Sequence, residues 1–292
     1  APEKRKGFFG SIPQAGVTIG MLMATFIVSL MTLFSEADFL SWGWRIPFLL
    51  SSVLVLLGLW IRKDIDETPD FQKVKASGQV AKAPLRDTLK HHWREVLIAA
   101  GLKVVETAPF YIFSTFVVSY ATSTLTYQKS QALEAVTLGA LVATIMIPLM
   151  GLLSDKVGRQ RMYAISVFVL GLFIVPWFML LNTGTTWGIV LATVIAFGVL
   201  WAPVTAVLGT LCSEIFSANV RYTGITLGYQ LGAALAGGTA PLIATGLLAK
   251  YDGDWVPVAW YLAVTVTISL IAIFCASRVK RATLIQAQPE RL

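Results

Sequence analysis

Two residues of opposite charge lie within a long apolar stretch of this sequence. Lys103 and Glu106 are three residues apart in the run from Val96 to Ala121. Residues with this spacing share one face of a helix, so the two side chains would meet. A charge in a hydrophobic medium is costly unless it is paired or hydrated. The pair therefore either neutralises itself within the helix or faces a polar cavity, where Lys103 would attract a carboxylate and Glu106 would respond to protons.

Aromatic residues near proline are further candidates for lining a pathway. Pro109 follows the charged pair, and a proline weakens a helix at a place where a gate must bend. Tyr111 comes two residues after Pro109, and Trp201 and Pro203 interrupt a later apolar run. Each ring would either line a passage for solute or simply pack against lipid and neighbouring helices.

A polar turn between two apolar runs combines glycine with charge. It reads Gly-Leu-Leu-Ser-Asp-Lys-Val-Gly-Arg-Gln-Arg from Gly151 to Arg161. A tight turn at Gly158 would aim Asp155 and Arg159 at neighbouring helix ends, where helix dipoles and opposite charges would latch one conformation. The plainer interpretation is a solvated basic turn.

The elements that carry these residues are predicted from composition and hydropathy. Hydrophobic residues make up 56% of the 292 residues, charged residues 13%, and the mean hydropathy is +0.71. A soluble domain is roughly 25% charged, so a water-soluble globule is excluded. The apolar runs lack the alternation of a barrel, which predicts an all-α membrane protein. Eight runs are long enough to span a bilayer: Ile12 to Phe34, Ile46 to Ile61 (or from about Trp42), Val96 to Ala121, Leu133 to Leu153, Met162 to Leu181, Trp187 to Leu211, Thr223 to Ala249 and Pro257 to Ala276.

Basic residues are distributed unevenly among the connections. Of the 23 lysines and arginines, 19 lie in the N-terminal segment, every second connection and the C-terminal tail. The other loops hold Arg45, Lys129 and Lys250, and Lys103 lies inside a run. The positive-inside rule then predicts that both termini of this chain are cytoplasmic. The long connection from Arg62 to Arg94 reads as a cytoplasmic linker with short amphipathic helices. A nucleic-acid-binding role for this basic segment is the alternative.

The sequence repeats itself weakly at an offset of 216 residues. This offset pairs Arg5 with Arg221 and Gln14 with Gln230. It also pairs Asp38 with Asp254 and Trp44 with Trp260, and each pair keeps the same side of the membrane. The first two runs would thus correspond to the seventh and eighth, which predicts parallel units of six helices. The two glutamines would either offer hydrogen bonds to a solute from two halves or join helices, since Gly16, Gly20, Gly232, Gly237 and Gly238 lie nearby.

These motifs together resemble the major facilitator superfamily. Gly151, Asp155, Gly158 and Arg159, with Arg161 one place late, match its cytoplasmic signature G-x-x-x-D-x-x-G-R-[RK]. The segment with Glu214 and Arg221 is similar to the loop before the eleventh helix of sugar-porter-like members. The segments Ala1–Gly7, Trp42–Leu50 and Glu67–Pro69 look more narrowly like the metabolite:proton symporter family, which carries shikimate-like acids, dicarboxylates, citrate, proline and betaine.

The resemblance implies a twelve-helix fold of which the visible runs are helices five to twelve. Four helices would precede Ala1, so the chain would be N-terminally truncated. Residues 1–61 would close the N-terminal half, 62–94 would be the linker, 95–277 the six-helix C-terminal half, and 278–292 a cytoplasmic tail. Much of the proton and substrate chemistry of such symporters lies on the first and fourth helices.

The function that the resemblance implies is proton-coupled symport of a small organic acid or zwitterion, by alternating access, in a bacterial inner membrane. The expected partners are that solute, protons and the bilayer, without nucleic acid, and the protein is expected to be a monomer. A proton-independent uniporter and a solute sensor on a transporter fold are the alternatives. An enzyme is not expected, because no catalytic motif is visible. Nor is a metal or cofactor, since Cys212 and Cys275 lack ligand spacing.

Overall fold

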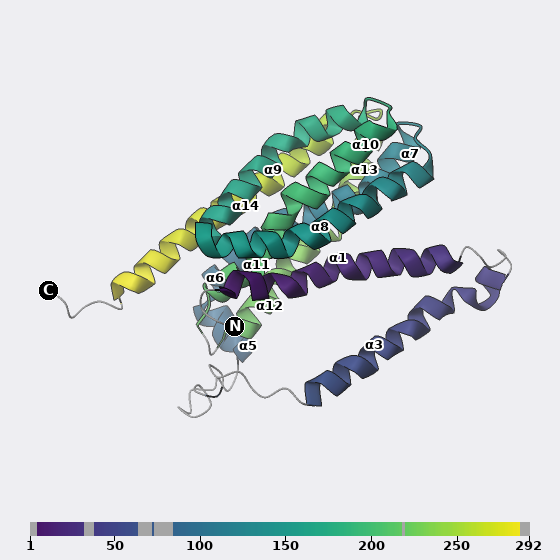
Figure 1. The fold of residues 1–292 in the computed structure, drawn as a ribbon. Helices are drawn as coiled ribbons and strands as arrows, with labels where there is room; N and C mark the ends of the chain where they lie inside the picture. The colour runs from purple at the N-terminus through teal and green to yellow at the C-terminus, as the bar shows by residue number, and fades with distance from the viewer. Residues whose placement is uncertain (1–4, 32–37, 64–71, 73–83, 218–219, 287–292) are drawn as a thin grey trace.

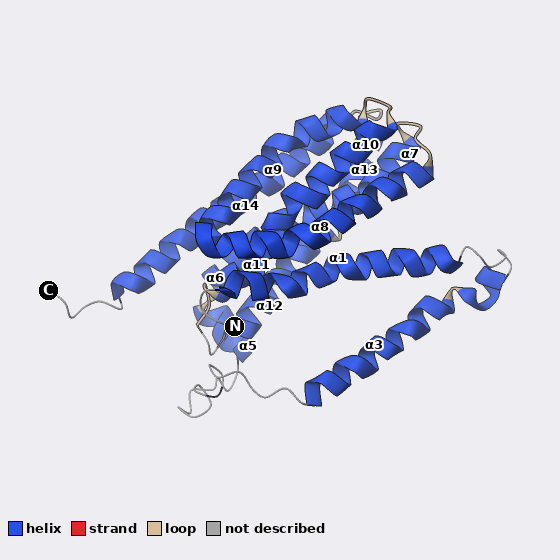
Figure 2. Cartoon of the chain, viewed as in Figure 1, coloured by secondary structure: helices blue, strands red, loops and turns tan. Residues whose placement is uncertain are grey.

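The computed structural model describes residues 5–31, 38–63, 72, 84–217 and 220–286. Every regular element within these ranges is a helix, as Figure 2 shows. The helices are, in chain order, α1 (Lys6–Met31), η2 (Phe39–Gly43), α3 (Arg45–Lys63), α5 (Pro84–His91), α6 (Trp93–Tyr111), η3 (Ile112–Phe116), α7 (Val117–Ser123), α8 (Lys129–Val157), α9 (Arg159–Leu181), α10 (Thr186–Thr193), η4 (Val194–Leu200), α11 (Trp201–Ser213), α12 (Arg221–Gly232), η5 (Ala233–Gly237), α13 (Ala240–Lys250) and α14 (Val256–Gln286).

These helices form eight segments that are long and apolar enough to cross a membrane, so the prediction of eight spans is confirmed. They are Lys6–Ile27, Phe39–Ile61, Trp93–Ser123, Lys129–Val157, Arg159–Leu181, Thr186–Ser213, Arg221–Lys250 and Val256–Arg278. The second span begins at Phe39, earlier than its apolar run indicated, because the π-helical turn η2 leads into α3. The first and seventh spans begin at Lys6 and Arg221, and the second and eighth begin at Phe39 and Val256. Both separations agree with the 216-residue offset to within one residue.

Helices α6 to α14 pack into one bundle with a common apolar core (Figure 1). Small residues let α12 approach α6 closely. An added Cβ would lie 2.5 Å from the Ala99 Cβ at Gly228, and 2.5 Å from the Ala100 carbonyl oxygen at Gly232. At Gly237 it would lie 2.3 Å from the Thr107 Cγ2. This packing holds α12 and η5 against the part of α6 that carries Lys103 and Glu106.

Two of the π-helical segments end three or four residues before a proline. Because proline has no N–H and its ring clashes with the carbonyl four residues earlier, it widens the preceding turn. Pro203 follows η4 and Pro241 follows η5 in this way. Pro109 also lies beside a π-helical segment, η3, which begins three residues after it. Three spans of the core are therefore irregular near their middle.

Helix α1 packs on the bundle through its first half. Ser11, Ala15 and Thr18 are buried on one face, and the Thr144 hydroxyl of α8 donates to Thr18 Oγ1 over 2.8 Å. Beyond Thr18 the described side chains of α1 are exposed or half-buried. Figure 1 shows α1 along α8, with α3 standing apart from the bundle. Contact between α1 and the bundle is thus concentrated at the end where α8 and α11 finish, which we call the motif end.

The long connection is partly described. Helix α5 confirms a short helix within it, whereas the remaining linker residues 64–71 and 73–83, including Glu67–Pro69 and Gly78, lie outside the described residues. So do Ala1–Lys4 and residues 287–292.

Candidate functional site

The Lys103–Glu106 pair is present and lies inside the bundle. The Lys103 ammonium contacts Glu106 Oε2 directly, and Glu106 is 7% exposed. Glu106 is 13 residues after the start of its span at Trp93, about 20 Å along the helix axis at 1.5 Å per residue. A buried ion pair near mid-span needs further hydrogen bonds to offset its desolvation.

Those hydrogen bonds come from α6 itself and from α11. The Thr107 hydroxyl donates to Glu106 Oε2 over 3.0 Å, and the Thr205 hydroxyl donates to Glu106 Oε1 over 3.1 Å. The Trp201 indole N–H donates to the backbone carbonyl of Glu106 over 2.7 Å. Both carboxylate oxygens are therefore partnered, and α11 is tied to α6 at this level.

The predicted aromatic residues divide between the core and its margin. Trp201 is 1% exposed and packs against Phe110 and Phe197, with ring centroids 5.3 and 5.2 Å away. Trp201 is therefore a core residue that packs between α6 and α11. Tyr111 is 37% exposed, and its ring meets that of Phe110 edge-on at 5.4 Å.

The two predicted glutamines lie in different environments. Gln14 on α1 is half-buried, whereas Gln230 on α12 is exposed. The residue that turns inward on α12 is Tyr229, whose ring centroid lies 4.9 Å from Lys103 Nζ. Of the glycines expected to bring helices together, Gly232 and Gly237 do so, while a Cβ at Gly16, Gly20 or Gly238 would meet nothing within 4 Å.

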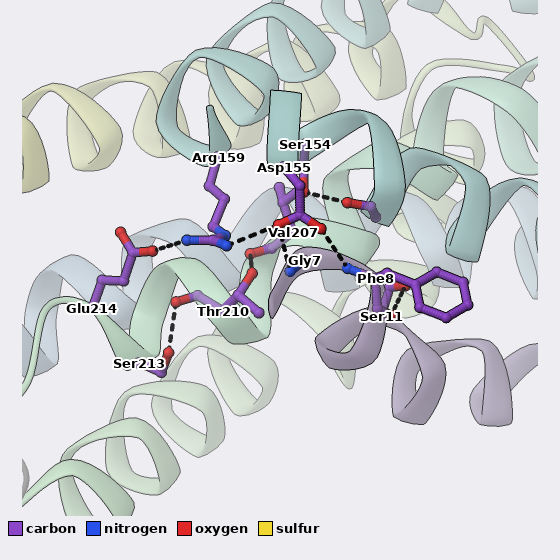
Figure 3. Close-up of polar contacts among 11 residues, drawn as sticks. Gly7, Phe8, Ser11, Ser154, Asp155, Arg159, Val207, Thr210, Ser213 and Glu214 are labelled. Atoms are coloured by element: carbon purple, nitrogen blue, oxygen red, sulfur yellow. Dashed lines mark hydrogen bonds and ion pairs between the residues drawn. The ribbon is translucent and has the colours of Figure 1, made fainter. Parts of the chain in front are cut away.

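The polar turn from Gly151 to Arg161 brings together the ends of α8, α9 and α1 (Figure 3). Gly158, with φ of +93°, separates α8 from α9. Asp155 accepts hydrogen bonds from the backbone N–H groups of Gly7 (2.8 Å) and Phe8 (3.2 Å), in the first turn of α1. A carboxylate at this position satisfies free N–H groups and complements the positive end of the helix dipole.

Arg159 extends this network from α9 to α11. Its guanidinium donates to Asp155 Oδ1 over 2.9 Å and forms an ion pair with Glu214 (Figure 3). We call the contacts among Asp155, Arg159, Glu214 and the Gly7–Phe8 backbone the latch. The latch joins α8, α9 and α11 to α1.

The other motif residues lie around the latch. At Gly151 an added Cβ would lie 2.3 Å from Ser11 Oγ, so glycine permits α1 to rest on α8. Arg161 is exposed and lines a surface hollow of about 340 Å³ with Arg159, Gln160 and Glu214. The Arg221 side chain donates to the Phe216 carbonyl over 3.4 Å, in the loop that follows α11.

Comparison with known proteins identifies the family. The family model described as Major Facilitator Superfamily matches residues 1–237 and, in a second, overlapping match, residues 109–291. These matches together cover nearly the whole chain. The chain belongs to the major facilitator superfamily.

Several curated members of the superfamily are similar to this chain. The shikimate transporter of Escherichia coli (strain K12) is 32% identical over 285 residues, which are 97% of this chain and 65% of that protein. The inner membrane metabolite transport protein YhjE of the same strain is 30% identical, with coverage of 97% and 65%. The glycine betaine/proline/ectoine/pipecolic acid transporter OusA of Dickeya dadantii is 29% identical, with coverage of 93% and 56%.

The chain thus spans 65% or less of the length of these relatives. Together with its eight apolar spans, they identify it as a multi-pass membrane protein of a transporter family and not of an enzyme family. Within that superfamily fold, sequence reasoning missed Thr205, Tyr229 and the Gly7–Phe8 amides. A threonine or a backbone N–H in an apolar helix carries no pattern that would single it out.

Proposed function

We propose that the protein is a proton-coupled symporter of a small organic acid or zwitterion, and that it works by alternating access. The observation that carries this proposal is the ion pair of Lys103 and Glu106 within the apolar bundle. Intramembrane ionisable residues are retained for ion or substrate pathways, because their burial is otherwise unfavourable. The solutes for which these relatives are named include shikimate, proline and glycine betaine, and each of these three carries a carboxylate.

The pair supplies a simple means of coupling. A proton that binds the Glu106 carboxylate removes its negative charge and ends the ion pair, while Thr205 and Thr107 keep the neutral group in place. Lys103 is then free to bind a solute carboxylate. Release of the solute restores the pair as the proton leaves Glu106. Proton and solute thereby move together, and each favours the same conformational state.

The latch supplies the conformational part of the proposal. The contacts of α1 with α8 and α11 at the motif end support the interpretation of this arrangement as a state closed at that end. The bias of lysines and arginines supports a cytoplasmic position for that end and for both termini of the chain. Opening would require Asp155 to leave the first turn of α1.

An uptake experiment separates symport from uniport. The full-length protein would be reconstituted in liposomes, and uptake of radiolabelled shikimate, proline and glycine betaine would be measured with and without an imposed pH gradient. Symport predicts accumulation above the external concentration that collapses when a protonophore is added. Uptake that ignores the gradient indicates the uniporter, and binding without flux indicates the sensor.

A further inference from the structure

Tyr229 has a buried hydroxyl on α12 whose nearest polar neighbour is a thiol. Among the described residues, no nitrogen or oxygen atom forms a hydrogen bond with it. The Cys212 thiol lies beside it, and a thiol is a weak hydrogen-bonding group. Buried hydroxyls nearly always have a good partner, so a weakly partnered one whose ring lies beside the Lys103 ammonium is a candidate for binding a ligand.

The Tyr229 hydroxyl lies near residues of two other helices, α11 and α1. A methyl group added at Gly209 of α11 would lie 3.9 Å from Tyr229 Oη and 4.0 Å from Gln14 Nε2 of α1. These two polar atoms therefore border the same small volume over Gly209. Lys103 Nζ lies 4.9 Å from the centroid of the Tyr229 ring and adds a cation to this wall.

The unused hydrogen-bonding capacity in this place consists mainly of donors. Glu106 accepts from Thr107, Thr205 and Lys103, so its carboxylate is already satisfied. Lys103 has three N–H groups and Glu106 as its ion-pair partner, and the Tyr229 O–H has only the weak Cys212 thiol beside it. Such a set favours a ligand that offers acceptors and negative charge.

We propose that Tyr229, Lys103 and Gln14 form a carboxylate subsite over Gly209, with Tyr229 donating its hydroxyl to the solute. This inference rests on the proposed function and deepens it by naming the group of the solute that is recognised. The subsite discriminates an acid from its ester, since an ester offers weaker acceptors and no charge.

The test is Tyr229→Phe, which removes the hydroxyl but keeps the ring that lies beside Lys103. Tyr222→Phe is the matched control, because Tyr222 lies on the same helix and is 85% exposed. Of shikimate, proline and glycine betaine, the solute with the fastest uptake is the probe, and its methyl ester is the competitor. We expect Tyr229→Phe to raise the KM of the acid roughly tenfold, a change of about 1.4 kcal/mol. The inhibition constant of the ester should stay the same, and Tyr222→Phe should change neither value.

A second variant and a second measurement guard against misfolding. Gly209→Ala would place its methyl in ordinary contact with both polar atoms, so it fills the space without displacing a helix. It should weaken binding of the acid in the same way. The Tm of the solute-free Tyr229→Phe protein should equal or exceed that of the parent, while the Tm increase produced by the solute should shrink.

The results distinguish the subsite from the proposed function. If one of the three acids is transported but Tyr229→Phe leaves its KM unchanged, the subsite is wrong and symport stands. A lower Tm for solute-free Tyr229→Phe would show that the hydroxyl is structural, and it would also overturn the subsite. If none of the three is taken up or bound, the proposed solute class and the subsite are both wrong.

Discussion

Replacing Asp155 by asparagine tests the latch, because it preserves the size of the side chain and removes its charge. The carboxylate accepts from the Gly7 and Phe8 amides and from Arg159. Hydrogen bonds to a charged group are worth about 1.5–3 kcal/mol, and neutral ones about 0.5–1.5 kcal/mol. Weakening the two backbone contacts by about 1 kcal/mol each gives about 2 kcal/mol in favour of opening the motif end. The population of the open state should rise roughly 30-fold.

A buried cysteine reports this opening. Ser11 is fully buried where α1 meets α8. A Ser11→Cys protein, with Cys212 and Cys275 replaced by alanine, would be alkylated with N-ethylmaleimide. When opening and closing are fast, the alkylation rate follows the open population, so Asp155→Asn should raise it up to about 30-fold. Glu134→Gln is the control, because Glu134 is an exposed acid on the same helix. An equal rate in the Asp155→Asn protein and its parent would refute the latch.

Three further predictions follow from the site, the packing and the topology. Lys103→Gln leaves the Glu106 carboxylate unpaired and should destabilise the protein by about 3–5 kcal/mol, whereas adding Glu106→Gln should restore most of the Tm; a double variant as unstable as the single one would contradict the ion pair. Gly232→Ala should lower the Tm because its Cβ would lie 2.5 Å from the Ala100 carbonyl oxygen, while Gly246→Ala, in open space, should not; equal Tm values would show that α12 does not need this approach. Cysteines in place of exposed Lys156 and Asp254 should react with an impermeant maleimide from opposite sides of the membrane, and labelling from one side would overturn the topology.

The sequence was sufficient to predict the spans and the charged pair. Runs of about 20 apolar residues leave the backbone no option but a helix, and the spacing of Lys103 and Glu106 places both on one face. The positions of Gly158 and Asp155 likewise indicated a turn beside a helix end, and the structure shows which helix it is.

The rotation of each helix about its axis could not be predicted. A run that is apolar on all sides has no marked face, so the sequence did not show that Tyr229 turns inward while Gln230 is exposed. For the same reason Trp201 fitted a pathway and a core position equally well, and the structure buries it against Phe110 and Phe197. The amides that hold Asp155 belong to the backbone, which carries no residue signature.

The most direct test of the coupling proposal is the movement of protons that accompanies the solute. Liposomes containing the full-length protein and an internal pH-sensitive dye would receive a pulse of the transported acid, without an imposed pH gradient. Our account predicts that the interior acidifies with the wild-type protein, and that Glu106→Gln abolishes this signal while solute exchange across the membrane continues. An equal proton signal from the Glu106→Gln protein would contradict the role of Glu106 as the coupling acid.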